Sequence, residues 1–133
     1  MTSTKPTLDR IVLYTGQILI REGDPGDSAY FVQSGVLGVY KQVGMDEVQV
    51  ATLVKNSIVG EMALITNSPR MATVKCIETS NIVVLTRGVL EEKLKEMDPL
   101  IRGLLEVFSQ RLTNLANDYS ALESRFQKLS KHK

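Results

Sequence analysis

Short apolar runs broken by turn residues fill the chain from about residue 11 to residue 87. Clusters of glycine, proline, asparagine and aspartate separate the runs. No repeat of fixed period is present, and strands of this length and spacing predict a β-sandwich or a β-roll. The expected strands are Ile11–Tyr14, Gln17–Arg21, Ala29–Gln33, Val36–Gln42, Glu47–Leu53, Arg70–Ile77 and Asn81–Thr86.

After Gly88 the apolar spacing changes from that of strands to that of helices. One helix is expected over Val89–Met97, and Asp98 and Pro99 then form the cap and first-turn proline of a second, longer helix. Nine apolar residues of the second helix follow one another at alternating steps of four and three. They are Ile101, Leu105, Phe108, Leu112, Leu115, Tyr119, Leu122, Phe126 and Leu129.

This apolar seam favours a parallel coiled coil between two copies of the chain. A lone helix that packs back on the roll would need a similar stripe, so that alternative stays open. The charges fit the parallel pairing less well, because Asp118 and Glu123 would face each other as like charges. The sequence therefore predicts a homodimer through the helix Pro99–Leu129.

Composition excludes several classes of function. The chain has 133 residues, 43% of them hydrophobic, which suits a single globular core. Sixteen basic and fifteen acidic residues give a net charge of +1, so nothing global attracts nucleic acid or an anionic membrane. The amino terminus lacks the apolar core of a signal peptide, and no apolar run is long enough to span a membrane. A cytoplasmic location is expected.

Cysteine and histidine are too scarce for the common catalytic and metal sites. Cys76 and His132 are the only residues of their kinds. The chain therefore lacks the second cysteine that an intrachain disulfide needs and the histidines that the common metal and catalytic sites need. We expect Cys76 to be a buried, inert thiol. The turn Gly23–Asp27 holds two aspartates but lacks the ligand set of a calcium loop. No metal, cofactor or enzymatic activity is expected.

The candidate chemistry lies in Val59–Lys75, which reads VGEMALITNSPRMATVK. Gly60 lets the backbone approach a ligand, and Glu61–Thr66 is long enough for one or two helical turns whose first N–H groups point outward. Pro69 ends the helix, so Arg70 opens a strand that returns towards the helix start. A phosphate there would meet N–H groups and a guanidinium.

Glu61 would repel a bare phosphate, but it can accept a hydrogen bond from a neighbouring sugar hydroxyl. One carboxylate and one guanidinium, Glu61 and Arg70, therefore predict a ligand with a ribose and a phosphate. Each residue alone has a plainer explanation, as a helix-start carboxylate or a charge on an edge strand.

The stretch resembles the phosphate-binding cassette of the cyclic-nucleotide-binding domain family, which includes catabolite activator proteins, kinase A regulatory subunits and cyclic-nucleotide-gated channels. The family pattern is Gly-Glu-x-Ala-Leu followed by Pro-Arg-x-Ala-Thr-Val. The matching residues are Gly60, Glu61, Ala63, Leu64, Pro69, Arg70, Ala72, Thr73 and Val74. Upstream, Arg21–Asp27 and Ser28–Gly35 look like the family's turn and following strand. The resemblance covers about residues 8–98.

The resemblance implies a role for each matching residue. Glu61 would bind the ribose 2′-hydroxyl, Arg70 would bind the exocyclic phosphate oxygens, and Asp27 would orient the arginine. The residues that would line the ligand, largely through backbone groups, are Gly60, Met62, Ala63, Met71 and Ala72. Members that prefer cyclic GMP commonly have Thr where this chain has Met71, which offers no donor to a purine. Cyclic AMP is therefore favoured, and cyclic GMP stays open.

The resemblance also implies the fold: mainly β with flanking helices, as a jelly-roll-like β-roll of about eight strands with a short phosphate-binding helix and two C-terminal helices. Residues 8–98 would form the binding domain, and residues 99–133 a long helix that acts as lid, dimer interface or both. Catabolite activators continue into a DNA-reading domain, for which this sequence leaves no room. The family's Gly-Asp turn is replaced here around Asn56, which tolerates the same left-handed geometry.

Two functions remain. The first is a sensor that binds a cyclic nucleotide and signals to an unidentified effector by moving its C-terminal helix. The second is a dimeric structural or interaction module with a degenerate pocket. Retention of both Glu61 and Arg70 favours the sensor.

Overall fold

The computed structural model describes residues 8–131, which contain six strands, one 3-10 helix and two α-helices. The chain divides into two compact units, the first ending at Lys95 and the second beginning at Glu96, and each is described by itself. The elements are β1 (Asp9–Leu13), β2 (Ile18–Ile20), β3 (Ser28–Val43), β4 (Asp46–Leu53), β5 (Ile58–Val59), η1 (Glu61–Leu64), β6 (Thr73–Thr86), α1 (Arg87–Lys95) and α2 (Pro99–Lys131).

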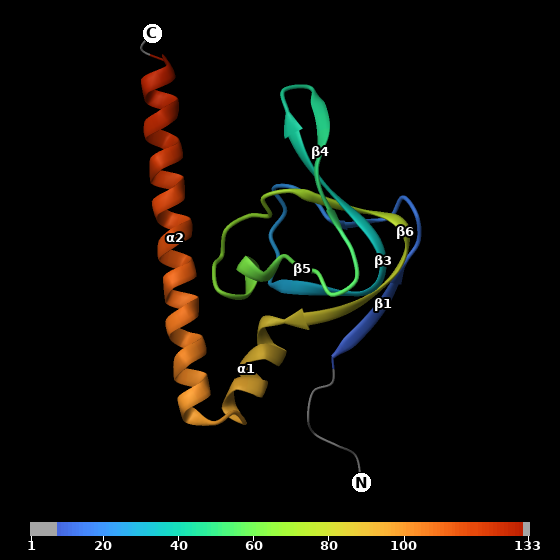
Figure 1. Ribbon diagram of the computed structural model, residues 1–133, viewed down its shortest axis with the longest axis vertical. Coiled ribbons are helices and arrows are strands. Elements are labelled where there is room, and N and C mark those ends of the chain that lie inside the picture. The colour runs from blue at the N-terminus through green and yellow to red at the C-terminus, as the bar shows by residue number, and fades with distance from the viewer. Residues whose placement is uncertain (1–7, 132–133) are drawn as a thin grey trace. The chain divides into compact units, whose positions relative to one another are not determined.

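Two long antiparallel strands, β3 and β6, form the spine of the first unit (Figure 1). Strands β1 and β2 pair with β6, while β4 and β5 pair with β3, and all pairings are antiparallel. The β3–β6 pairing shifts register three times between Val32 and Leu37, which lets the strands bend into a roll. The predicted fold class, mainly β with a short helical turn and C-terminal helices, is confirmed.

The described residues hold six strands where about eight were expected. The presumed breaks at Ser34-Gly35 and Glu78–Ser80 are irregularities inside β3 and β6, so two pairs of predicted strands are each one long strand. Gly35 has φ 100°, and Ser80 packs against it so closely that a side chain at position 35 would collide. β5 has only two residues, too few to show a strand period in the sequence.

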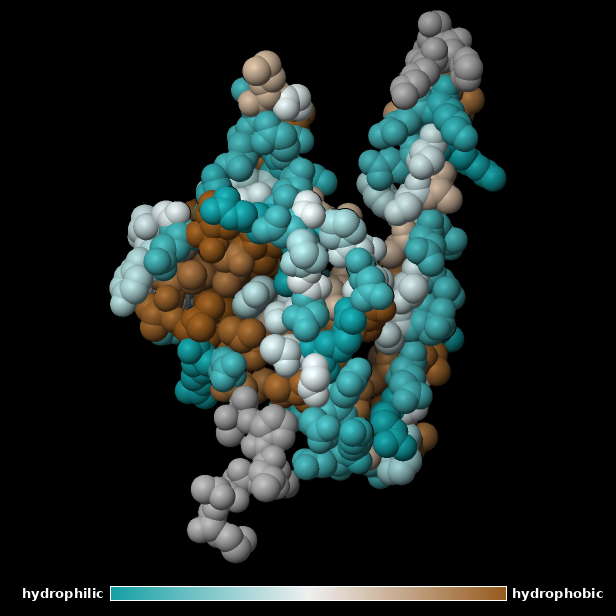
Figure 2. Space-filling model, turned by 180° about the vertical axis from the view of Figure 1, so that it is seen from behind, coloured by the Kyte–Doolittle hydropathy of each residue, from teal (hydrophilic) through white to brown (hydrophobic). Residues whose placement is uncertain are grey.

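The core of the roll is built from strand residues that point inward. They are Leu13, Ile20, Val32, Leu37, Val74, Cys76 and Ile82. Cys76 is a buried free thiol whose Sγ donates to the carbonyl of Glu78 at 2.9 Å, which confirms the expected buried position. Apolar side chains also reach the surface of the roll, as the brown areas of Figure 2 show, and Val12, Phe31 and Ile58 are among the exposed ones.

Both α-helices begin at a polar cap. The N–H of Val89 donates to Thr86 Oγ1 at 3.2 Å, and α1 therefore starts at Arg87, two residues earlier than expected. The N–H of Leu100 donates to Asp98 Oδ1 at 2.8 Å, and α2 starts at Pro99. The predicted cap and first-turn proline of the long helix are confirmed.

Replacing Asp98 by Ala is expected to lower the stability of α2 by about 1 kcal/mol, because the N–H of Leu100 loses its side-chain acceptor. Asp98→Asn is the matched control, since an amide oxygen caps as well as a carboxylate. Denaturant unfolding followed by circular dichroism measures both. Equal stability of the Ala and Asn variants would show that the cap does not contribute.

Candidate functional site

The candidate site starts at a tight turn after β5. Gly60 has φ 77° and is the N-cap of η1, a single 3-10 turn that lies within the one or two helical turns expected but ends at Leu64, two residues before Thr66. The N–H of Ala63 donates to the carbonyl of Gly60 at 3.1 Å. Asn56, just before β5, has φ 73°, so the left-handed turn expected there is present.

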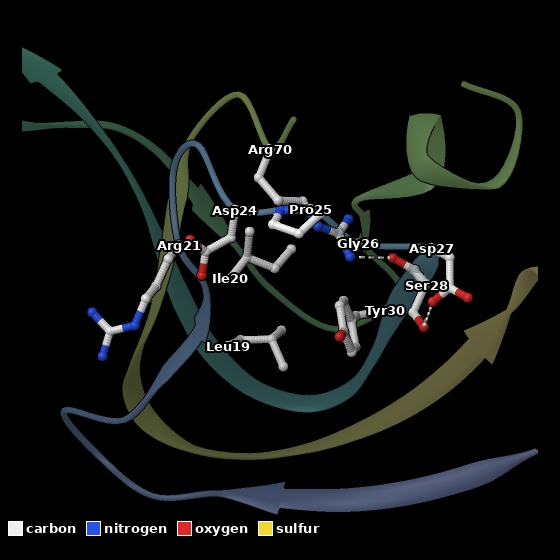
Figure 3. A pocket seen from close by; sticks show the side chains of 10 residues that line it. All are labelled: Leu19, Ile20, Arg21, Asp24, Pro25, Gly26, Asp27, Ser28, Tyr30 and Arg70. Carbon is white, nitrogen blue, oxygen red and sulfur yellow. Dashed lines mark hydrogen bonds between the residues drawn. The ribbon is translucent and has the colours of Figure 1, made fainter. Parts of the chain in front are cut away.

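Arg70 returns to the start of η1, as the sequence predicts. Its Nη1 donates to the carbonyl of Gly60 at 3.3 Å, and its Nη2 donates to the carbonyl of Ser28 at 2.8 Å (Figure 3). Its backbone is tied to the turn before β3, because its N–H donates to Asp24 at 2.9 Å and its carbonyl accepts from Gly23 at 2.8 Å. Both ends of the residue are therefore fixed by backbone groups.

The guanidinium of Arg70 is half-buried but has no carboxylate partner. Within residues 8–131 no Asp or Glu forms an ion pair with it, and its side-chain hydrogen bonds go to two neutral carbonyls. The ring centroid of Tyr30 lies 5.8 Å from its Cζ, a favourable cation–π arrangement. A cation that is held only by dipoles and a ring keeps its charge available to an anion.

A cavity of about 150 Å³ lies beside this guanidinium. Tyr30 and the side chains of β2 form one wall, and the turn before β3 forms another (Figure 3). Its lining residues are Leu19, Ile20, Arg21, Asp24, Pro25, Gly26, Asp27, Ser28, Tyr30 and Arg70. Arg70 and Asp27 are the two predicted site residues among them.

The carboxylates of the site differ in their surroundings. Glu61 is exposed, and no hydrogen bond or ion pair engages its carboxylate in the described part of the chain, so its oxygens are free to accept. Asp27 accepts a hydrogen bond from Ser28 Oγ at 3.2 Å rather than from Arg70. Its role in orienting the arginine stays a prediction.

The remaining predicted ligand-lining residues belong to the cassette but not to the cavity wall. Met62 and Ala72 are half-buried, and Ala63 is buried. Met71 is 66% exposed, so its side chain is available to a ligand that extends beyond the cassette. The structure therefore joins Gly60 and Arg70 directly and leaves the roles of these four residues as predictions.

Arg87 was not anticipated from the sequence. It stands where β6 gives way to α1, and its Nη2 donates to the carbonyls of Ala63 and Thr66, the latter at 2.9 Å. Its Nη1 donates to Asn67 Oδ1 at 3.1 Å, and its backbone N–H donates to the carbonyl of Asp27 at 3.1 Å. One residue thus ties α1 to the far end of η1. No spacing or motif marks it in the sequence.

Two absences apply to residues 8–131. This part of the chain holds no group of three or more His, Cys, Asp or Glu placed to bind a metal ion. In the same range no helix combines the length and apolar character needed to cross a membrane. His132, the only histidine, lies outside the described residues.

Residues 10–97 match the family described as "Cyclic nucleotide-binding domain". The chain belongs to this family. The match runs from β1 to the end of α1 and contains η1, Arg70 and the turn before β3, so the family's binding domain coincides with the unit that holds the candidate site.

The relatives are larger proteins, and this chain matches one part of each. The cAMP-dependent protein kinase regulatory subunit of Dictyostelium discoideum is 28% identical over 114 residues, which are 83% of this chain and 35% of that protein. The human potassium/sodium hyperpolarization-activated cyclic nucleotide-gated channel 1 is 31% identical over 117 residues, which are 88% of this chain and 13% of that protein. The chain therefore spans about a third or less of these relatives.

Among solved structures, the EAL enzyme Bd1971 in a halfsite-occupied form matches with a TM-score of 0.78 and 29% identity, covering 83% of this chain and 99% of that one. Its cAMP-bound form matches with a TM-score of 0.62 and 28% identity over 90% of this chain and 32% of that one. Its cGMP-bound form matches with a TM-score of 0.60 and 31% identity, over 78% of this chain and 28% of that one.

Proposed function

We propose that this protein is a sensor that binds a cyclic nucleotide, with cyclic AMP as the favoured ligand. The observation that carries the proposal is Arg70, a half-buried guanidinium held by the carbonyls of Ser28 and Gly60 and left without a carboxylate partner among residues 8–131. It faces a cavity in a domain of the cyclic-nucleotide-binding family. Binding, rather than catalysis, is the activity proposed.

In this proposal Arg70 binds the exocyclic phosphate oxygens and Glu61 accepts a hydrogen bond from the ribose 2′-hydroxyl. The positions that line the ligand are Gly60, Met62, Ala63, Met71 and Ala72. The N–H of Ala63 now donates to Gly60, so its use by a phosphate requires that bond to be exchanged. Asp27 lines the same cavity as Arg70 and is proposed to orient it when the phosphate is bound.

The preference for cyclic AMP rests on Met71. Its exposed thioether offers no hydrogen-bond donor to the edge of a guanine. Calorimetric titration with cyclic AMP, cyclic GMP and cyclic di-GMP under one set of conditions tests the preference. We expect cyclic AMP to bind most tightly. Tighter binding of cyclic GMP or of the dinucleotide would contradict the ligand assignment while leaving the binding function intact.

Glu61→Gln is expected to weaken cyclic AMP binding by only about tenfold, because the amide oxygen still accepts from the ribose hydroxyl but carries no charge. Glu61→Ala removes the acceptor and is expected to cost more. The calorimetric comparison includes Glu91→Gln on the exposed surface of α1 as the matched control. Equal affinity of Glu61→Ala and the unsubstituted protein would remove Glu61 from the site.

Signalling is proposed to run from the cassette to the C-terminal helices. Arg87 supports this route, because it joins the carbonyls of Ala63 and Thr66 to the first residue of α1. A ligand shifts the helices only if it binds one arrangement better than the other. Hydrogen exchange of α1 and α2 with and without saturating cyclic AMP tests this step, and unchanged exchange in both helices would contradict it.

The proposed partner of α2 is a second copy of the chain. The nine seam residues are 40% to 70% exposed, although their spacing is that of a buried coiled-coil core. This unpartnered seam also supports the second candidate, a dimeric interaction module with a degenerate pocket. A dimer that binds no cyclic nucleotide would favour that candidate over the sensor.

A further inference from the structure

Gly26 lies in the turn before β3, and its backbone does not require glycine. Gly23, in the same turn, has φ 87°, a left-handed conformation that favours glycine. Gly26 is not among the residues with positive φ, so an alanine would meet no backbone strain there. Another reason must account for the missing side chain.

The space that a side chain at position 26 would need is occupied by Arg70. A Cβ built on Gly26 would lie 2.5 Å from Nε and 2.7 Å from Cζ of Arg70, and closer still to Nη2. A Cβ built on Gly60 would lie 2.6 Å from Nη1 of the same guanidinium. Arg70 therefore passes through a slot between two glycines, and Figure 3 shows its guanidinium next to Gly26 and Ser28.

We propose that Gly26 is a positioning residue for Arg70, an inference that rests on the proposed phosphate-binding role of that arginine. The slot holds the guanidinium plane so that Nη2 reaches the carbonyl of Ser28 and Nη1 that of Gly60. A methyl group at position 26 would displace the end of the arginine side chain, because the atoms it meets are all side-chain atoms, which can move by rotation about the side-chain bonds. We therefore expect the substitution to weaken ligand binding without lowering the stability of the fold.

Calorimetry in two backgrounds tests the proposal. With Arg70 present, Gly26→Ala is expected to weaken cyclic AMP binding by about tenfold or more, because a displaced fork loses paired hydrogen bonds to phosphate. Gly88→Ala is the matched control, since a Cβ there meets nothing nearer than 4.0 Å, and it is expected to leave binding unchanged. In an Arg70→Lys background Gly26→Ala is expected to cost less than about twofold, because lysine has no planar fork to place.

A measurement without ligand separates this inference from the proposed function. The Nε–H signal of Arg70 in nitrogen-15 NMR spectra, identified by its loss in Arg70→Lys, reports the order of the guanidinium. We expect its heteronuclear Overhauser effect to fall in Gly26→Ala and to stay unchanged in Gly88→Ala, while the melting temperatures of both variants remain close to that of the parent.

Three outcomes separate the positioning role of Gly26 from the proposed cyclic-nucleotide binding. An unchanged Overhauser effect in Gly26→Ala overturns the positioning role, and so does an equal loss of affinity in the arginine and lysine backgrounds. If the unsubstituted protein binds no cyclic nucleotide, the proposed function fails, and the ligand-binding consequence of Gly26 fails with it. In that case, loss of guanidinium order in Gly26→Ala but not in Gly88→Ala would still support the positioning of Arg70 between Gly26 and Gly60.

Discussion

Arg70→Ala is expected to weaken cyclic AMP binding by about thirty-fold or more, which corresponds to about 2 kcal/mol or more. The variant removes the one half-buried guanidinium of the cavity and leaves the carbonyls of Ser28 and Gly60 without its donors. A bound phosphate would then be desolvated without an opposite charge. Calorimetric titration of folded variant protein measures the loss.

Arg21→Ala is the matched control for this prediction. Arg21 lines the same cavity, but its guanidinium points away from Arg70 and towards solvent (Figure 3). The two variants lose the same charge, so a general electrostatic effect would weaken binding in both. We expect Arg21→Ala to change affinity by less than about threefold. Unchanged affinity in a folded Arg70→Ala variant would remove the cassette from the binding site.

Leu115→Glu is expected to convert a dimer into a monomer. Leu115 lies at the middle of the seam and is 63% exposed in the single chain. In a coiled coil it would be a core residue, and a carboxylate there costs at least about 3 kcal/mol of association free energy. The dissociation constant of the dimer should rise by about a hundred-fold or more. Sedimentation at several protein concentrations measures it.

Asn114→Glu is the control, because it adds the same charge one residue away and outside the seam. It is expected to sediment as the parent does. The like-charge pair of Asp118 and Glu123 lowers the stability of a parallel dimer by only a few tenths of a kcal/mol, roughly the worth of one exposed charge pair, and does not forbid it. Identical sedimentation of Leu115→Glu and the parent, whether both are monomers or both dimers, would defeat the proposed interface.

The sequence predicted the parts of the site that depend on neighbouring residues. The left-handed turn at Asn56, the return of Arg70 after Pro69, and the cap at Asp98 follow from local backbone chemistry, and the structure contains each of them. Apolar runs and turn residues are also local signals, and they predicted a β-sandwich or a β-roll, while the choice of the roll came from the family resemblance. The predicted strand ends at Ser34-Gly35 and Glu78–Ser80 were wrong. There β3 and β6 stay continuous because they pair with each other, which the local sequence does not indicate.

The contacts that complete the site connect residues far apart in the chain. Arg70 donates to Ser28, 42 positions away, and Arg87 donates to Ala63, 24 positions away. Both acceptors are backbone carbonyls, which every residue possesses, so no residue type in the sequence indicates them. The space at Gly26 is likewise defined only by the folded position of Arg70. The sequence marked the Gly23–Asp27 turn as part of the family pattern, but it did not indicate that Gly26 leaves room for Arg70.

Arg70 and Glu61 are proposed to bind the phosphate and the ribose of a cyclic nucleotide. The most direct test is calorimetric titration of cyclic AMP into the unsubstituted protein at physiological salt. We expect saturable binding with one nucleotide per chain. No heat of binding at millimolar cyclic AMP, with the protein shown to be folded, would contradict it.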